Sequence, residues 1–236
     1  MDIRPDTLIA DVARQHPSTV KVFQRLGIDF CCGGRRPLEE ACREHGLDYG
    51  VVATELEVAR QRPAAGDDWD QRPLAELTRH IVQRYHEAVR RDGPLLGELA
   101  AKVASRHGDR HPELREVETL FRQVQQEMRT HMAKEERVLF PLIERLETSG
   151  AALSDFLGSL DGPIAAMEDD HDEVARLFAR IRALTSGFLP PPDSCNSFRG
   201  LYQGLADLEA DTHHHIHLEN NVLFPRAQEM AERAAS

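Results

Sequence analysis

The sequence predicts an all-α protein, with a small N-terminal helical domain followed by a four-helix bundle that has a metal core. Three observations predict this fold. Apolar residues recur at spacings of three and four along four long segments, and no segment alternates with the period of a strand. A thirteen-residue block occurs twice, which indicates an internal repeat. Each copy places a histidine and a glutamate on one helical face, as metal-binding bundles do.

Residues 1–62 are expected to form the small N-terminal domain from several short helices. The second of these helices is expected to end at Gly27, and the third to begin at Pro37. A fourth is expected from about Tyr49 to Arg60. Two adjacent cysteines and two glycines, residues 31–34, predict an irregular turn. So small a unit buries little apolar surface, and we therefore expect it to dock on the rest of the chain.

Residues 73–236 are expected to form the bundle, after a polar linker at about 61–72. Each bundle helix carries an apolar stripe at helical spacing. The expected helices run from Pro73 towards His107 with a kink at 92–94, from Pro112 to Glu147, from Gly162 to about Gly187, and from Ser197 past Glu219.

Composition excludes several classes of protein. The formal charge is −11, with 40 acidic and 29 basic residues, so the chain would be repelled by a nucleic-acid backbone. No basic and apolar leader is recognisable, and no apolar run approaches the ~18 residues of a membrane span. Four cysteines, two of them adjacent, do not form a disulfide framework. We therefore expect a reduced, cytoplasmic protein that does not bind membranes.

The repeated block reads His-x-x-x-Glu followed by Val-Leu-Phe-Pro, at 131–141 and again at 215–225. Residues four apart lie on the same face of a helix, so each copy can offer both donors to one site. A weaker repeat of similar period relates two single histidines in similar sequence contexts. The predicted metal ligands are His86, His131, Glu135, His171, His215 and Glu219.

Six donors are too many for one zinc ion, and imidazole with carboxylate suits iron or manganese. If both glutamates bridge, two metals each receive two histidines and two shared carboxylates. A single helical His-x-x-x-Glu is usually a surface pair, but its duplication in matching contexts favours a metal site. The Val-Leu-Phe-Pro segments are expected to serve packing, with a proline that bends the helix. By helical phase His80, His213, His214 and His217 are expected outside the ligand set, the last three mostly exposed or behind the ligands. His107 is also expected outside it, because it would lie ~30 Å from His86 along a continuous helix.

With these motifs the chain resembles the RIC (repair of iron centres) proteins, in which a small Cys-Cys-Gly-Gly domain precedes a hemerythrin-like bundle. The matching segments include 29–34, 84–86, 168–171, the two repeated blocks, and three prolines followed by Cys195. The resemblance implies a non-haem di-iron site, possible oxo bridging, and iron ligands at the six residues named above. It also implies repair of iron–sulfur clusters after nitrosative or oxidative damage, by iron donation or nitric-oxide chemistry. Damaged iron–sulfur proteins, nitric oxide and oxygen species would be the partners, and a homodimer is left open.

Cys31 and Cys32 are the candidate reactive residues. Their thiolates could bind released iron, accept a nitrosyl group or sense redox state, and the alternative is a pair of half-buried free thiols. Cys42 and Cys195 are isolated and are expected to be small apolar or loop residues.

Two other functions remain open at this point. One is a hemerythrin-like protein that binds or senses oxygen, nitric oxide or iron without turnover, so enzymatic activity is undecided. The other is an interaction protein whose bundle is merely stabilised by metal. The Cys-Cys-Gly-Gly domain favours repair, and the chain has no large signalling domain that would favour sensing.

Overall fold

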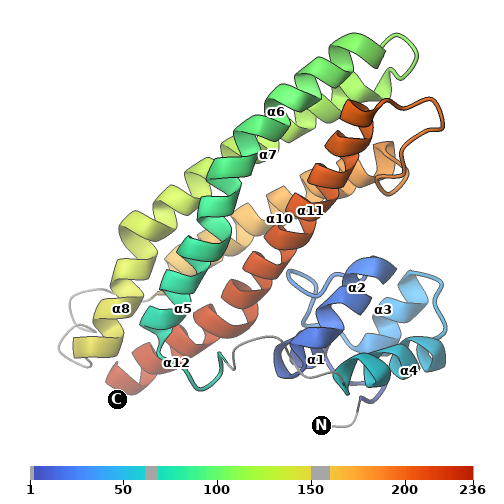
Figure 1. Cartoon of the computed structure of the whole chain (residues 1–236). Helices are drawn as coiled ribbons and strands as arrows, with labels where there is room; N and C mark the ends of the chain where they lie inside the picture. The colour runs from blue at the N-terminus through green and yellow to red at the C-terminus, as the bar shows by residue number, and fades with distance from the viewer. Residues whose placement is uncertain (1–2, 62–68, 150–159, 236) are drawn as a thin grey trace.

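The computed structural model describes residues 3–61, 69–149 and 160–235. The all-α prediction is confirmed: in these ranges the only β pairing is an isolated bridge between Leu8 and Pro37. The N-terminal helices are α1 (Ile9–Gln15), α2 (Val20–Leu26), α3 (Leu38–Glu44) and α4 (Tyr49–Arg60), with a 3₁₀ turn, η1 (Pro17–Thr19), between the first two. They form the separate unit drawn in blue and cyan in Figure 1.

The N-terminal unit has an apolar core of its own. Phe23, Phe30 and Leu56 are at most 1% exposed at its centre. Helix α2 ends at Gly27, whose φ of 71° is the left-handed conformation that glycine adopts without strain. The Cys-Cys-Gly-Gly turn lies so close to α1 that a Cβ on Gly34 would meet the Ala10 Cβ at 2.8 Å. The turn is therefore packed against a helix.

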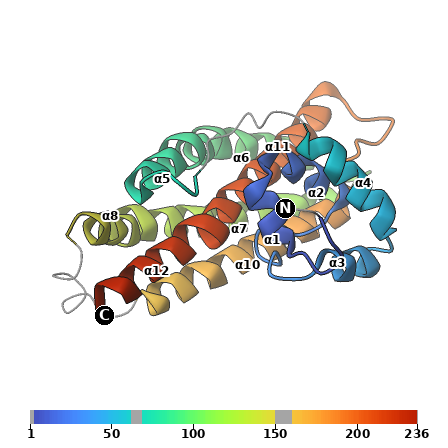
Figure 2. The same ribbon diagram turned by 90° about the horizontal axis from the view of Figure 1, so that it is seen from below.

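In the described residues the bundle consists of four long helical arms, whose arrangement Figures 1 and 2 show. The first, second and fourth arms each contain a five-residue π-helical turn that links two α-helices. The third arm along the chain is one uninterrupted helix. The arms are α5 (Leu74–Ile81), η2 (Val82–His86) and α6 (Glu87–His107); α7 (Glu113–Lys134), η3 (Glu135–Leu139) and α8 (Phe140–Ser149); α10 (Asp161–Leu184); and α11 (Asn196–Leu218), η4 (Glu219–Leu223) and α12 (Phe224–Ala235).

Each of the two repeated prolines is the second residue after a π turn. A proline has no N–H for the carbonyl four residues earlier, and for Pro141 and Pro225 those carbonyls lie inside η3 and η4. In a π turn the backbone hydrogen bonds span five residues instead of the four of an α-helix. The missing N–H of the proline is therefore accommodated, and a π turn and a proline occur together in both repeats. Pro94, by contrast, lies inside α6, which continues through the expected kink at 92–94 without a break.

Two apolar clusters divide the bundle core along its length. One contains Phe121 and Met128 of α7 and Leu208 of α11, and the other contains Phe140 and Phe224 at the starts of α8 and α12. The residues between these clusters in the sequence are the histidines and glutamates of the repeated blocks. The polar layer is therefore enclosed by apolar side chains on both sides along the bundle.

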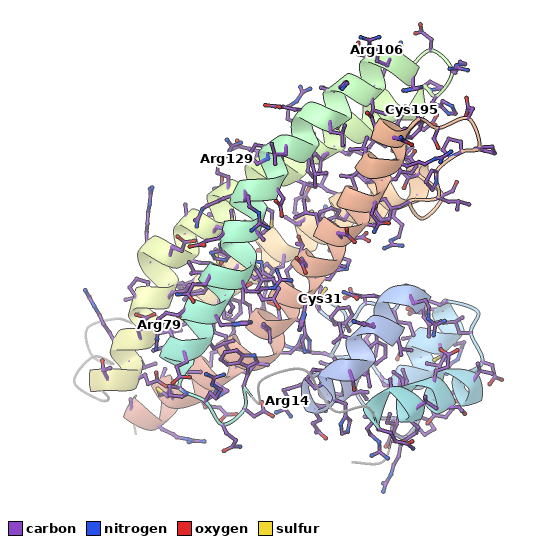
Figure 3. The ribbon with its side chains drawn as sticks, in the orientation of Figure 1. Arg14, Cys31, Arg79, Arg106, Arg129 and Cys195 are labelled. Carbon is purple, nitrogen blue, oxygen red and sulfur yellow. The ribbon has the colours of Figure 1, made fainter. Side chains whose placement is uncertain are left out.

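The N-terminal unit docks on α11 and η4, in agreement with the sequence expectation. Gln24 donates a hydrogen bond to the Ala210 carbonyl at 3.0 Å, and Asn221 donates to the Phe30 carbonyl at 3.4 Å. Figure 3 shows Cys31 on the side of this unit that faces the bundle. Residues 62–68 of the expected linker lie outside the described residues, and the carbonyls of Trp69 and Arg72 accept hydrogen bonds from Arg226 on α12. Among the described helices, none combines the length and apolar character needed to cross a membrane.

Candidate metal centre

Six polar side chains, each at most 1% exposed, meet in the layer between the two apolar clusters. Two come from each repeated block, and the other two are the single histidines of the weaker repeat. They are His86 at the end of η2, His131 on α7, Glu135 at the start of η3, His171 on α10, His215 on α11 and Glu219 at the start of η4. The structure therefore brings together all six residues that the repeat singled out.

The six side chains form two overlapping groups of four, each compact enough to surround one ion. Within each group the donor atoms lie within 4.8 Å of one another. Both glutamates belong to both groups. The first group is His86, Glu135, His215 and Glu219, and the second is His131, Glu135, His171 and Glu219. Each position combines one histidine from each half of the chain, so neither half contains a complete site.

The donor atoms point towards the centres of these groups. Oε2 of Glu135 lies 3.3 Å from His86 Nε2 and 3.2 Å from His131 Nε2. The two oxygens of Glu219 divide: Oε1 lies 2.7 Å from His215 Nε2 and Oε2 lies 3.1 Å from His171 Nε2. Each carboxylate therefore lies near one histidine of the first position and one histidine of the second, as a bridging ligand must.

Three of the four oxygens of the two buried carboxylates lack a hydrogen-bond donor among the described residues. Both oxygens of Glu135 and Oε2 of Glu219 have no hydrogen-bond partner in the described part of the chain. A buried, unpaired carboxylate costs several kcal/mol unless a cation compensates it, on the order of the penalties known for buried ions. Two neighbouring buried carboxylates with four imidazoles around them therefore fit a pair of bound cations.

The electrostatics agree with this interpretation. Burial and Glu219 oppose ionisation of Glu135, but the nearby histidines outweigh them and lower its pKa. The pKa of Glu219 is also lowered, because His215 and His171 outweigh its burial. Burial lowers the pKa of His131, but the charge of Glu135 and the contact with Asp170 reverse this and raise it to about 10. Metal binding at neutral pH must therefore displace a proton from His131.

A second layer of side chains orients the imidazoles. Nδ1 of His86 donates to Oε1 of Glu136 at 2.6 Å, and Nδ1 of His171 donates to Oδ1 of Asn220 at 2.8 Å. Because these oxygens only accept, each Nε2 keeps its lone pair for the centre of the site. Helical phase does not mark Glu136 and Asn220 as partners of the site, although they directly follow the two glutamates at equivalent repeat positions.

The candidate reactive cysteines lie on a turn organised by Asp29. Its carboxylate accepts from the backbone N–H groups of Cys31 and Cys32, both at 3.0 Å, and of Gly33 at 2.9 Å. The two Sγ atoms are 3.9 Å apart and the cysteines are free. The hydrogen bond with Cys32, burial and the charge of Asp29 all raise the pKa of Cys31 well above its usual value. In this conformation Cys31 is therefore a thiol, not the thiolate considered above, while Cys32 is half-buried.

The remaining histidines lie outside the six-residue site, as expected. His80 packs on Trp69 with ring centroids 4.7 Å apart. His217 is only 2% exposed and lies 3.3 Å from the Phe30 carbonyl, so of the two expected alternatives, exposed or behind the ligands, exposure is excluded. His107 lies 3.3 Å from the sulfur of Cys195, which Figure 3 shows at the far end of the bundle.

Comparisons with known proteins agree with this architecture. Residues 77–227 match the Hemerythrin HHE cation binding domain, and residues 5–60 match a Domain of Unknown function (DUF542). The chain is 37% identical over 227 residues to the iron–sulfur cluster repair protein YtfE of Yersinia pseudotuberculosis, covering 96% of this chain and 98% of that protein. It is also 37% identical over 222 residues to YtfE of Cronobacter sakazakii, covering 94% and 96%.

Proposed function

The chain belongs to the family of iron–sulfur cluster repair proteins with a hemerythrin HHE domain, and we propose that it restores clusters damaged by nitrosative or oxidative stress. We propose further that its bundle holds two iron ions, with His86, His131, Glu135, His171, His215 and Glu219 as ligands. Damaged iron–sulfur proteins would be its clients, and nitric oxide or oxygen species its small ligands.

One observation carries the proposal: two buried carboxylates, each near a histidine of both positions, with oxygens that no protein donor satisfies. Two ions are proposed because both glutamates belong to both four-residue groups. Iron is proposed because the donors are imidazole nitrogen and carboxylate oxygen, without thiolate. Two irons held in this way would supply a redox-active centre with coordination positions open to small ligands.

The chain's own residues bind and protect such a centre. Glu136 and Asn220 fix the orientation of two imidazoles, and the apolar clusters above and below the layer exclude water. Among the forms of repair, the donor set favours iron donation. Nitrogen and oxygen donors hold ferrous iron less tightly than the thiolates and sulfides of a cluster, so iron can pass from the bundle to a client.

The test is reactivation of an iron–sulfur dehydratase whose cluster has been damaged by nitric oxide. The expected result is that anaerobically iron-loaded protein restores activity, whereas the Glu135→Ala/Glu219→Ala variant, which lacks both carboxylates, does not. His80→Asn, a change outside the ligand set, serves as the matched control and should repair at the wild-type rate. Purification with one tightly bound zinc ion and no capacity for iron would contradict the proposal.

A further inference from the structure

A cavity of about 320 Å³ lies inside the bundle, between α6, α7 and α11. It adjoins the metal layer, because Thr212, which lines it, lies one helical turn before His215 on α11. None of the six proposed metal ligands is among the residues that line it. Its volume is at the lower end of the range found for small-molecule sites. The cavity is therefore a separate space of the size of a small organic molecule.

The walls of this cavity are apolar. They are formed by side chains that are at most 8% exposed, namely Phe121, Val124, Met128 and Met132 of α7 and Leu208 of α11. Helix α6 contributes Gly93, where an added Cβ would meet only Nε2 of Gln125, at 3.8 Å. The glycine therefore leaves room where another residue would carry a side chain. Methionine sulfur makes favourable contacts with aromatic rings, so two methionines beside Phe121 suit an aromatic body.

The inner wall of the cavity carries one buried hydroxyl group. Thr212 is 1% exposed, and its Oγ1 has no hydrogen-bond partner in the described part of the chain. A helical threonine commonly donates to the carbonyl one turn earlier, and Thr212 does not. Because an unpaired buried hydroxyl is costly, a ligand group that bonds to it gains affinity. The inner wall therefore favours a ligand with a hydroxyl or carbonyl at that end.

Two arginines mark the open side of the cavity. Arg90 and Arg129 are its exposed lining residues, and Figure 3 shows Arg129 at the outer surface of the bundle. Arg90 donates to Oε1 of Glu136 at 2.6 Å, which balances much of its charge. Arg129 makes no ion pair among the described residues, and its guanidinium donates to the neutral Oε1 of Gln126 at 2.9 Å. None of the lining residues is acidic, so the mouth complements a single negative charge.

We propose that this cavity binds a small aromatic monocarboxylate. Its carboxylate lies at Arg129, its ring lies among the methionines and Phe121, and a hydroxyl or carbonyl at its other end bonds to Thr212. The ligand carries one charge because Arg129 is the one lining cation without a carboxylate partner. A second carboxylate would be buried among apolar walls without a cation, which is costly. The site goes beyond the proposed repair of clusters and does not depend on bound iron.

Isothermal titration calorimetry of the full-length protein tests the site with three probes of similar shape. The first probe, 4-hydroxyphenylacetate, carries the charge, the ring and the hydroxyl. Phenylacetate lacks the hydroxyl, and tyramine replaces the carboxylate by an ammonium group. We expect saturable binding of 4-hydroxyphenylacetate at one site per chain and no saturable binding of tyramine. Phenylacetate should bind about three- to tenfold more weakly, as for the loss of one neutral hydrogen bond.

Substitutions at the two ends of the cavity separate their contributions. Thr212→Val keeps the shape without the hydroxyl and should bind the two carboxylates equally, whereas Thr212→Ser should keep the preference. Arg129→Gln should weaken both carboxylates about two- to fivefold, as for an exposed ion pair, and less at high salt. Arg122→Gln is the matched control. Arg122 lies on the same helix, two turns earlier, pairs with Glu118 and does not line the cavity, so this variant should bind like the wild type.

Absence of saturable binding of 4-hydroxyphenylacetate, or equal binding of phenylacetate by the wild type, would overturn the inference. So would an unchanged preference in Thr212→Val, or equal effects of Arg129→Gln and Arg122→Gln. If Thr212→Val does not fold, the three probes on the wild type and on Arg129→Gln still decide. A new visible phenolate-to-iron band during titration of iron-loaded protein would place the ligand on the metal instead of in the cavity, and would also overturn the inference.

Discussion

The Nε2 atoms of His86 and His215 lie 3.1 Å apart, although 129 residues separate them in the sequence. Both rings are fully buried, and both point their Nε2 atoms at the same place. Two neutral imidazoles that face each other gain little unless a proton or a metal ion lies between them. His131 and His171 form an equivalent pair, with their Nε2 atoms 3.2 Å apart.

We predict that reconstituted protein binds two irons per chain. Each facing pair of histidines, completed by the two shared glutamates, provides four protein donors for one ion. Because ligand binding and folding are coupled, loading should also raise the temperature of unfolding. Metal analysis together with thermal denaturation checks both points. A ratio of one iron per chain would contradict the bridging role given to both glutamates.

The glutamates should matter more than single histidines. Glu135→Ala or Glu219→Ala removes a donor from both positions, whereas His86→Ala or His171→Ala removes a donor from one. We expect the glutamate variants to retain less iron and to lose more of the stability that iron adds. Iron content after gel filtration and the unfolding temperature of loaded protein measure this. If a single histidine variant lost both irons while a glutamate variant kept them, the assignment of shared ligands would be wrong.

Protonation of His217 should weaken the structure in acid. Burial, with a smaller contribution from His214, lowers the pKa of His217 to about 3. A histidine whose folded pKa is depressed contributes its full share of stability above the unfolded pKa of 6.5 and loses it as the pH falls from 6.5 towards 3. At pH 5 the loss is about 2 kcal/mol, an order-of-magnitude value from 1.36 kcal/mol per pH unit.

Urea denaturation of metal-free wild type and His217→Asn at pH 7.5 and pH 5 tests this effect. The asparagine variant keeps a polar side chain near the Phe30 carbonyl but cannot titrate. Its stability should therefore fall less between the two pH values than that of the wild type. Other buried histidines, such as His214, titrate in both proteins and cancel in the comparison. Identical falls in the two proteins would show that His217 is not the group responsible.

The paired cysteines should be dispensable for iron binding and required for repair. Cys31 and Cys32 belong to the N-terminal domain, and the six proposed ligands all lie in the bundle. The Cys31→Ala/Cys32→Ala variant should keep two irons and the visible spectrum of the wild type but lose reactivation of a damaged iron–sulfur enzyme. Cys195→Ala, at the far end of the bundle, is the control. Repair at the wild-type rate by the double variant would assign the chemistry to the bundle alone.

Much of this arrangement could be predicted from sequence because it is periodic. Duplication of His-x-x-x-Glu at helical spacing was sufficient to single out His131, Glu135, His215 and Glu219. The outer partners could not be found in this way. In a regular α-helix the residue after a glutamate lies about 100° from it, so Glu136 and Asn220 would be placed away from the site. The π turns that begin at each glutamate break that regular phase, and no apolar pattern in the sequence marks them.

The burial of His217 could not be decided from the sequence for a different reason. Helical phase describes one helix by itself and correctly places His217 off the His215 face. The surface that covers His217 belongs to the N-terminal unit, whose Phe30 carbonyl lies 187 residues away in sequence. Docking of the small unit was expected, but the surface that it covers leaves little periodic signal in either unit, so the sequence does not show which histidine becomes buried.

Because each metal position takes one histidine from each half of the chain, the centre cannot assemble while the protein is being synthesised until residue 219 has emerged. A nascent chain that ends before α11 has only His86, His131, Glu135 and His171, with no position complete. The proposed iron site therefore gains its full set of donors only when α11 and the start of η4 are present.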